Sequence, residues 1–213
     1  PDGTRDFVSD GQCRVGRSFV SGYNFTQYET HDYTAWADCL SPDFDDSTWP
    51  HAVPVPPLLT EYGESDCPRD HVAALLSPRV VAETENGRIY DCGENTVGYP
   101  VLAVTAARGE TVTVRFSEEL REGRLDGAHT HAQRFSVVSD GTGRTVQPEF
   151  TWFGFRYFEV SGGADVVCVK VVHADVPETA AFTCDSETLN WIYRTFVHTM
   201  LCNMHTGIPS DCP

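Results

Sequence analysis

The sequence predicts a mainly β protein, with an antiparallel, jelly-roll-like β-sandwich region followed by one helix near the end of the chain. Three observations favour this fold class. Apolar and polar residues alternate in several short segments within residues 86–172, as they do in half-buried strands. Turns rich in Gly and Asp separate these segments. After residue 185 the apolar residues recur at the spacing of an amphipathic helix.

The composition limits the classes of partner. The chain has 213 residues, of which 40% are hydrophobic and 11% aromatic, and its formal net charge is −16. Such a chain can bury a substantial core and does not resemble a disordered one. Nucleic acid is not expected as a partner, since phosphate binding needs clustered Lys and Arg. No apolar stretch reaches the length of a membrane span, so no membrane partner is expected either. A neutral, hydroxyl-rich ligand such as a carbohydrate is compatible with this charge.

The eight cysteines are scattered along the chain without a CxxC pair. A chain of this length does not depend on a disulfide framework for its stability. We therefore expect most cysteines to be free thiols, buried like small hydrophobic side chains. Their redox state and the compartment, cytoplasmic or exported, stay open.

The first 82 residues have no regular pattern and are rich in Pro, Asp and aromatic residues. The sequence Pro-Val-Pro-Pro at residues 54–57 cannot enter a helix or a central strand, which predicts an extended surface connection. Trp36 and Trp49 are interpreted as core anchors rather than sugar-stacking platforms, because large aromatic side chains dominate core packing.

Two hairpins and two further strands are expected in the middle of the chain. The first hairpin covers residues 102–116, and the second covers residues 135–146 with a Gly-rich turn. Residues 152–160 are aromatic on both faces, which is typical of a strand between two layers. Residues 164–172 form a last strand, rich in Val.

A helix is expected to begin at Asp185 or Ser186, because either side chain can accept hydrogen bonds from free backbone N–H groups. It should end near Asn203, because Gly207 and Pro209 prevent it from continuing. Its apolar face consists of Leu189, Ile192, Tyr193, Phe196 and Met200. A lone amphipathic helix after a β-domain needs partners to cover that face. We therefore expect a helical domain to begin here.

Two groups of residues could suggest a metal site. Four residues combine ligand types at tight spacing: His198, Cys202, His205 and Cys212. His129 and His131 would share one face of an extended segment. A helix end and an exposed turn explain the two groups more simply, so neither a metal nor another cofactor is expected.

Glu118 and Glu119 could suggest an acid/base pair for glycoside hydrolysis. On a strand, adjacent side chains point to opposite faces of the sheet. We therefore expect these two residues to form a solvated strand end rather than to flank one glycosidic bond.

Four stretches carry a resemblance to a known family. They are Tyr-Asp-Cys-Gly-Glu-Asn-Thr-Val-Gly at 90–98, Arg-Phe-Ser-Glu-Glu-Leu at 115–120, Phe-Thr-Trp-Phe-Gly-Phe-Arg-Tyr-Phe-Glu-Val at 150–160, and Asn-Met-His-Thr-Gly-Ile-Pro-Ser-Asp-Cys-Pro at 203–213. In order and spacing they resemble the bacterial α-L-rhamnosidases, glycoside hydrolase family 78. Each stretch alone is a weak signal, but four in the same order are specific. The departures, at Cys92, Glu94 and Phe153, fall in scaffold motifs.

The resemblance implies an inverting glycoside hydrolase that removes terminal α-L-rhamnose from glycosides. It places the general acid and the general base beyond Pro213, so this chain is expected to contain no catalytic residue. It also implies that Asp211 hydrogen-bonds the hydroxyls of the bound rhamnose, a task for which a carboxylate can accept several hydrogen bonds.

The resemblance further implies three regions. Residues 1–82 would be a partial accessory β-domain and linker, residues 83–178 a concanavalin-like β-sandwich, and residues 179–213 the beginning of an (α/α)6-barrel catalytic domain. The implied partners are a rhamnose-containing glycoside and the remainder of the catalytic domain. The alternative function is a free-standing, non-catalytic carbohydrate-binding module. An exposed apolar stripe on residues 189–200 would distinguish the two, because a complete module would not leave it uncovered.

Overall fold

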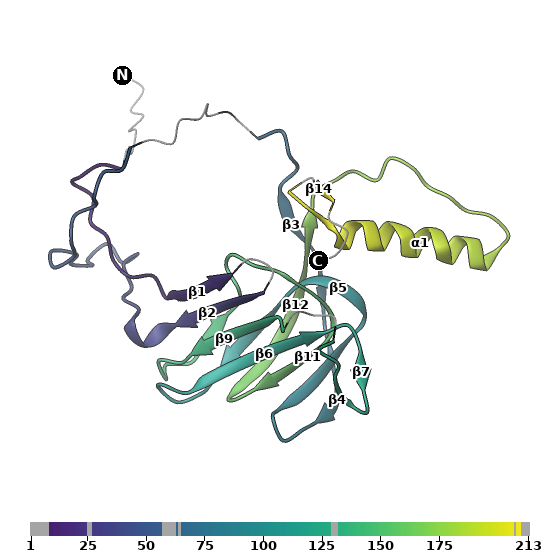
Figure 1. Ribbon diagram of the computed structural model, residues 1–213, viewed down its shortest axis with the longest axis horizontal. Helices are drawn as coiled ribbons and strands as arrows, with labels where there is room; N and C mark the ends of the chain where they lie inside the picture. Colours follow the sequence, from purple (N-terminus) through teal and green to yellow (C-terminus); the bar gives the residue numbers. More distant parts are fainter. Residues whose placement is uncertain are drawn as a thin grey trace. The chain divides into compact units, whose positions relative to one another are not determined.

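The computed structural model describes most of the chain and divides it into two compact units (Figure 1). The described residues are 9–24, 27–56, 63, 65–128, 132–206 and, for their backbone, 208–209. The smaller unit comprises residues 1–19 and 35–65, and the larger unit comprises residues 20–34 and 66–213.

Aromatic packing and one arginine hold the smaller unit together. The rings of Phe44 and Trp49 lie 5.1 Å apart, and Trp36 packs edge-to-face against Phe19 at 6.1 Å. Arg14 donates a hydrogen bond of 2.8 Å from Nη1 to the carbonyl oxygen of Trp49. Both indoles are half-buried in these contacts, which favours their interpretation as packing anchors.

The larger unit is built on a ten-stranded sheet. The order of its hydrogen-bonded strands is β1-β2-β9-β6-β11-β5-β12-β3, and β4 and β10 also pair with β5. These strands are β1 (Val20–Asn24), β2 (Tyr28–Asp32), β3 (Asp70–Leu76), β4 (Arg79–Glu83), β5 (Arg88–Val104), β6 (Thr111–Ser117), β9 (Arg134–Val138), β10 (Arg144–Val146), β11 (Phe153–Ser161) and β12 (Ala164–Ala174). The remaining described elements are η1 (Tyr33–Ala35), β7 (Leu120–Arg121), β8 (Arg124–Leu125), α1 (Glu187–Cys202), β13 (Met204–His205) and β14 (Ile208–Pro209).

Strand β5 makes the sheet curl. It has 17 residues, and its two halves pair with different neighbours. Residues 88–98 pair with β11, and residues 98–104 pair with β12. Gly98 belongs to both pairings, so the sheet changes direction at this residue. The prediction of a mainly β chain with one helix near its end is confirmed.

Both predicted hairpins are wrong, although their strands exist. Strand β11 lies between β5 and β6 and pairs with both. Strand β9 pairs with β2 and β6, whereas β10 pairs with β5. The turn sequences reverse the chain as expected, but a turn does not decide which strand becomes the neighbour. A strand that is apolar on both faces needs cover on both, and strands from distant parts of the chain can lie beside it in the sheet.

The first 82 residues contribute more regular structure than their sequence pattern indicates. Strands β1, β2 and β3, and most of β4, come from this region and join the same sheet. Strand β2 pairs with β9 in parallel, whereas the other paired strands of the described sheet are antiparallel. Short edge strands have little periodicity of their own, because their partners are distant in the sequence.

The core of the larger unit is rich in phenylalanine. Phe135, Phe153, Phe155 and Phe158 are fully buried. Phe116 stacks on Phe153 with ring centroids 4.1 Å apart. Burying one such side chain stabilises the fold by about 1.5–3 kcal/mol. This core accounts for the period-two pattern of β6 and for the aromatic character of both faces of β11.

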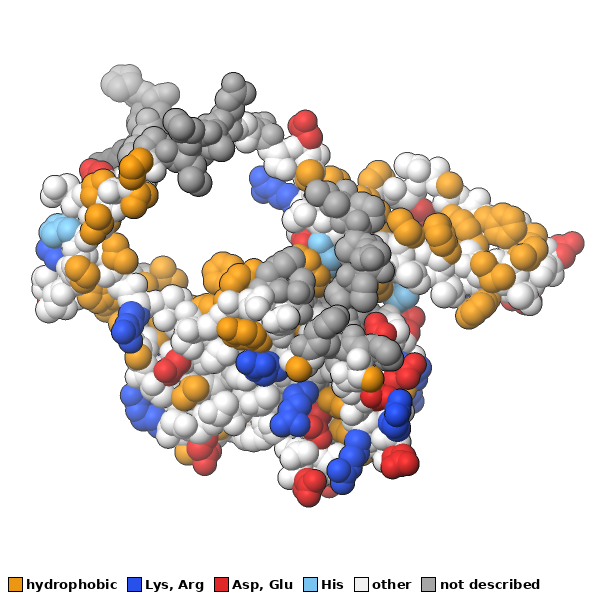
Figure 2. Space-filling model, in the orientation of Figure 1, with side chains coloured by type: hydrophobic (Ala, Val, Ile, Leu, Met, Phe, Trp, Pro, Cys, Tyr) orange, Lys and Arg blue, Asp and Glu red, His pale blue; other side chains and the backbone are white. Residues whose placement is uncertain are grey.

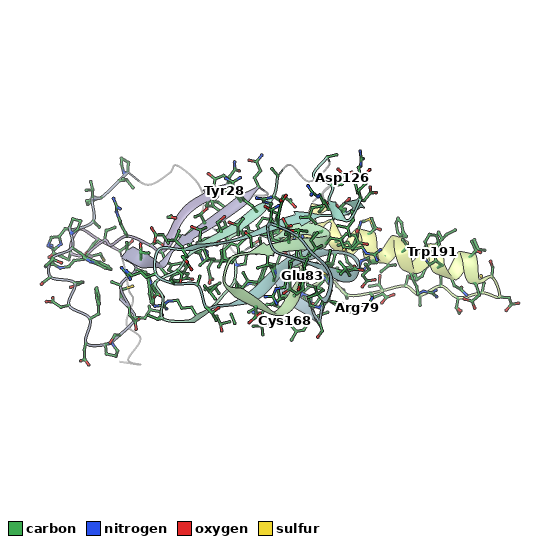
Figure 3. All side chains as sticks on the ribbon, turned by 90° about the horizontal axis from the view of Figure 1, so that it is seen from below. Tyr28, Arg79, Glu83, Asp126, Cys168 and Trp191 are labelled. Carbon is green, nitrogen blue, oxygen red and sulfur yellow. The ribbon has the colours of Figure 1, made fainter. Side chains whose placement is uncertain are left out.

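Helix α1 begins and ends where the sequence predicts. The hydroxyl of Ser186 caps it by accepting a hydrogen bond from the backbone N–H of Leu189, and Asn203 forms the C-cap. Its apolar face is uncovered in this chain: Leu189 and Ile192 are each 49% exposed, and Phe196 is 62% exposed. Figure 2 shows the hydrophobic side chains gathered along this helix, and Figure 3 shows Trp191 on it, away from the strands. No helix in the described part of the chain is both long and apolar enough to cross a membrane.

The seven cysteines in the described residues are all free thiols, as expected. The prediction that most of them are buried is wrong: three are exposed (Cys13, Cys39 and Cys67), and the other four are half-buried (Cys92, Cys168, Cys184 and Cys202). Cys13 precedes β1, and Cys39 and Cys67 lie between η1 and β3, so none of the three is in a strand of the large sheet. Cys92 and Cys202 do lie in largely apolar surroundings, and burial raises the pKa of their thiols to about 12 and about 11.

We predict that Gly98→Ala destabilises the larger unit. Gly98 has a φ of +144°, and a Cβ there would collide with the carbonyl oxygen of Lys170 on β12. Strain of this kind costs about 1–3 kcal/mol before any displacement of β12 is counted. Thermal unfolding should therefore begin several degrees lower than in the wild type. Gly93→Ala is the matched control, because Gly93 has a φ of +92° with nothing within 4 Å of the added Cβ. Equal decreases in the melting temperature of the two variants would contradict the prediction that Gly98 is needed for the close contact between β5 and β12.

Candidate functional site

The candidate site is the junction between the end of α1 and the sheet. After the C-cap at Asn203, strands β13 and β14 pair in a tight antiparallel hairpin. Thr206 lies in its turn with a φ of 52°, a left-handed backbone conformation. Asp211 follows two residues after Pro209 and lies outside the described residues, so its predicted contact with sugar stays a prediction.

Three side-chain and backbone contacts fix this hairpin to the sheet. The Nδ1 atom of His205 lies 3.2 Å from Oδ2 of Asp70, the first residue of β3. The backbone N–H of Thr206 donates a hydrogen bond of 2.7 Å to Oδ1 of the same carboxylate. The indole of Trp152, just before β11, stacks on the His205 ring with centroids 4.0 Å apart and an interplanar angle of 19°. We call Asp70, Trp152, His205 and Thr206 the junction clamp.

The ring of His205 is buried. It is 7% exposed, and burial lowers its pKa below 6.5, although Asp70 acts in the opposite direction. Because a carboxylate only accepts hydrogen bonds, Nδ1 carries the proton that points to Asp70. The Nε2 atom is buried and has no hydrogen-bond partner among the described residues.

The lowered pKa of His205 predicts a pH-dependent loss of stability. Below about pH 6.5 the unfolded chain binds a proton at this residue that the folded chain excludes, and stability falls wherever the unfolded state binds more protons. His205→Asn removes the titration. The melting temperature of this variant should therefore fall less than that of the wild type between about pH 7.5 and about pH 5.5. Parallel curves would show that His205 titrates normally in the fold.

A polar cleft of about 510 Å³ includes Asn95 of β5 in its lining. Arg156, which lines the cleft, makes a bidentate contact with Asp91: its Nε and Nη2 atoms donate to Oδ1 at 2.9 Å and to Oδ2 at 3.2 Å. The hydrogen bond from Arg156 lowers the pKa of Asp91 against the opposing effect of burial. The lining residues are Asn95, Glu118, Glu119, Leu120, Arg156 and Tyr157.

This cleft brings together three of the four stretches that carry the family resemblance, a convergence that the sequence analysis missed. The fourth stretch follows α1, and His198 of that helix donates from Nε2 to the carbonyl oxygen of Asn95 at 2.6 Å. Glu118 and Glu119 both line the cleft. The expectation that they point to opposite faces is wrong, because β6 ends at Ser117 and these residues lie in the loop beyond it.

A second cleft, of about 530 Å³, has a largely apolar floor at Phe116 and charged walls. Its acidic residue Glu159 already accepts a hydrogen bond of 2.7 Å from Thr84 and lies 3.8 Å from Arg115.

Glu29 and His31 form a fully buried pair on β2 that the sequence analysis did not single out. The Nε2 atom of His31 lies 2.5 Å from Oε1 of Glu29. The backbone N–H groups of Glu149 and Phe150 donate to the same carboxylate at 2.7 and 2.9 Å. Burial raises the pKa of Glu29, but these hydrogen bonds outweigh it, and the net pKa is lowered. The pair is structural: it holds the segment that leads to Trp152.

Two groups of residues were possible metal ligands, although no metal site was predicted. Within the described residues, no three or more His, Cys, Asp or Glu side chains gather as a metal site would require. His198 and Cys202 are in contact, with Nε2 and Sγ 3.6 Å apart. His129, His131 and Cys212 lie outside the described residues.

The curled sheet and the anchored helix define a β-domain joined to one amphipathic helix. Residues 82–176 match the family model described as the bacterial alpha-L-rhamnosidase concanavalin-like domain. The predicted resemblance to the bacterial α-L-rhamnosidases is thereby confirmed.

Relatives and solved structures extend the similarity over the whole chain. An α-L-rhamnosidase of Formosa agariphila is 28% identical over 229 residues, covering 100% of this chain and 24% of the relative. One of Streptomyces avermitilis is 29% identical over 236 residues, covering 100% of this chain and 22% of the relative. The chain thus spans about a quarter of the length of these curated relatives.

Two solved structures share the fold. The α-L-rhamnosidase from Dictyoglumus thermophilum superposes with a TM-score of 0.88 at 27% identity, covering 97% of this chain and 25% of that one. The Streptomyces avermitilis enzyme complexed with L-rhamnose superposes with a TM-score of 0.83 at 26% identity, covering 93% and 20%.

Proposed function

We propose that this chain is the amino-terminal part of an inverting glycoside hydrolase that removes terminal α-L-rhamnose from glycosides. The observation that carries the proposal is the similarity of the entire chain, in sequence and in fold, to α-L-rhamnosidases. One of the similar structures holds L-rhamnose. No cofactor is part of the proposal.

In this proposal the chain itself is scaffold. Inversion needs one carboxylic acid that protonates the leaving oxygen and one carboxylate that activates water, on the order of 6.5–9.5 Å apart. Both groups are proposed to lie beyond Pro213, and Asp211 is proposed to accept hydrogen bonds from the rhamnose hydroxyls. The junction clamp supports this role, because it fixes the hairpin that leads to Asp211.

The finer architecture is part of the same proposal. Residues 1–82 would form an accessory region and linker, residues 83–178 a β-sandwich, and residues 179–213 the beginning of an (α/α)6 barrel. The exposed apolar face of α1 supports the last assignment, because the remaining helices of a barrel would cover it. The same face argues against a free-standing carbohydrate-binding module, which would expose these side chains to water.

The test is an assay of the complete protein that contains this chain. The complete protein should hydrolyse p-nitrophenyl α-L-rhamnopyranoside but not p-nitrophenyl β-D-glucopyranoside. Proton NMR of the first product should show β-L-rhamnose, since inversion changes the anomeric configuration. A first product in the α form would overturn inversion. If calorimetry shows that the protein binds a rhamnoside without hydrolysing it, the proposal of an enzyme would be overturned and that of a carbohydrate-binding module supported.

A further inference from the structure

We propose that the second cleft of the larger unit binds an acidic sugar, and that Arg115 and Arg134 hold the oxyanion of this ligand. The chemical class is a saccharide that carries a carboxylate or a sulfate group. The inference goes beyond the proposed function, because it concerns binding by the β-domain and does not require the protein to hydrolyse rhamnosides.

Two arginines lie directly opposite each other on neighbouring strands at this cleft. Arg115 of β6 is the register partner of Arg134 of β9, and both residues line the cleft. Directly opposed residues of an antiparallel pair project from the same face of the sheet, and like charges in such a pair are destabilising. An anion bound between the two guanidinium groups would remove this repulsion.

The carboxylate of Glu159 neutralises only part of this positive charge. Glu159 of β11 is the register partner of Arg115 on its other side, and its Oε2 atom lies 3.8 Å from Nη1 of Arg115. Strands β9, β6 and β11 lie side by side in the sheet (Figure 1), so the charges across it run positive, positive, negative. Arg134 makes no ion pair with an Asp or Glu of the described residues, and its guanidinium carbon lies 4.7 Å from the centre of the Tyr28 ring.

A third arginine adds to the positive charge of the cleft. Arg124 of β8 also lines it and lies 3.9 Å from Glu85, with both side chains about three-quarters exposed. Three arginines therefore meet two glutamates in this cleft, whereas the whole chain has 15 Lys and Arg against 31 Asp and Glu. The local excess of positive charge favours an anionic ligand. An oxyanion fits best, because a guanidinium group can donate to two of its oxygens at once.

The remainder of the cleft fits a sugar ring. Its volume of about 530 Å³ lies within the range of about 300–1,000 Å³ that is usual for small-molecule sites. Thr84, Asn86 and Gln133 line it beside the arginines, and side chains of these types exchange hydrogen bonds with hydroxyl groups. An apolar floor, here at Phe116, with a few convergent polar groups is the usual build of such a site.

The alternative is a solvated charged face that binds no ligand, and calorimetric titration of the complete protein separates the two. The probes are D-glucuronate and D-glucose 6-sulfate, with D-glucose as the sugar without charge and acetate as the anion without a sugar. The tighter-binding acidic sugar should have a Kd of about 1 mM, as is usual for ligands of this size. Glucose and acetate should bind at least about tenfold more weakly. The ratio of the affinities for glucuronate and glucose 6-sulfate identifies the preferred oxyanion.

Arg134→Gln should weaken binding of the preferred acidic sugar about tenfold or more, because the oxyanion loses a charged hydrogen-bond donor. Arg79→Gln is the matched control. Arg79 is an exposed arginine of β4 in the same unit that does not line the cleft. This control should leave the affinity unchanged.

Glu85→Gln should have the opposite effect. It removes a negative charge from the lining of the cleft at an exposed position, so the affinity for the acidic sugar should rise about twofold or more. Damage to the fold could only weaken binding. A rise in affinity in Glu85→Gln together with a fall in Arg134→Gln therefore separates an electrostatic site from a structural effect.

Four results would overturn the inference: no binding of either acidic sugar at about 10 mM, equal affinities for these sugars and for glucose or acetate, equal affinities in Arg134→Gln and Arg79→Gln, or weaker binding in Glu85→Gln. Because the titration involves no hydrolysis, each of these results is independent of whether the complete protein acts on rhamnosides. The failure of this inference and the failure of the proposed function can thus be distinguished.

Discussion

Residues 1–213 produced alone should release p-nitrophenol from the aryl α-L-rhamnoside no faster than buffer does. The proposed general acid and base both lie beyond Pro213, and each such group typically contributes about 10²–10⁴ in rate. Losing both should therefore cost at least about 10⁴ relative to the complete protein. This is the largest effect that the proposed function predicts for any change to the protein.

The measurement compares the purified fragment with the complete protein at equal concentration. A circular dichroism spectrum dominated by β structure verifies that the fragment is folded, so that inactivity is not a result of unfolding. Turnover that co-elutes with the fragment on size exclusion would show that a catalytic group lies within these residues. Glu118 and Glu119, which share the polar cleft, would then be the first residues to replace.

The second large effect is expected from Asp211→Asn in the complete protein. A hydrogen bond to a charged group contributes about 1.5–3 kcal/mol. If the carboxylate of Asp211 holds a rhamnose hydroxyl, kcat/KM should fall roughly ten- to a hundredfold, and further if it holds two. The melting temperature should stay close to that of the wild type, since the predicted role concerns the sugar.

Both quantities should be measured on one preparation of Asp211→Asn. Normal kinetics would remove Asp211 from the sugar site. A loss of activity together with a large fall in the melting temperature would instead indicate that Asp211 forms a turn after Ile208 and Pro209. Asp165→Asn, a change of the same kind at an exposed position, provides the reference for an uninvolved aspartate.

The sequence predicted helix α1 closely because the signals for a helix are local. Ser186 caps it, Asn203 ends it, and the apolar spacing between them lies within one segment. The strands β6 and β11 were located for the same reason: the alternation of β6 and the aromatic residues on both faces of β11 are visible within seven and nine residues. Strands β1 to β3 were missed, because their place in the sheet depends on partners elsewhere in the chain, such as β9 for β2 and β12 for β3.

The candidate site was predicted only in part. The family resemblance singled out the stretch 203–213 and Asp211, whereas His205 was considered only as a metal ligand and set aside. Nothing in the sequence indicated that Asp70 would bind His205, since the two are 135 residues apart. The pairing of Glu29 with the backbone of Glu149 was equally invisible, across 120 residues.

By itself, then, the sequence determined the class of fold, the limits of the helix and the family, because periodicity, capping and motif order are properties of neighbouring residues. Only the tertiary structure decided which strands pair, where the sheet curls and how the segment before Asp211 is held. The physical reason is that these features depend on burying both faces of β5 and β11 and on satisfying buried carboxylates such as Glu29. The partners that do so are brought together by the fold and not by proximity in the chain.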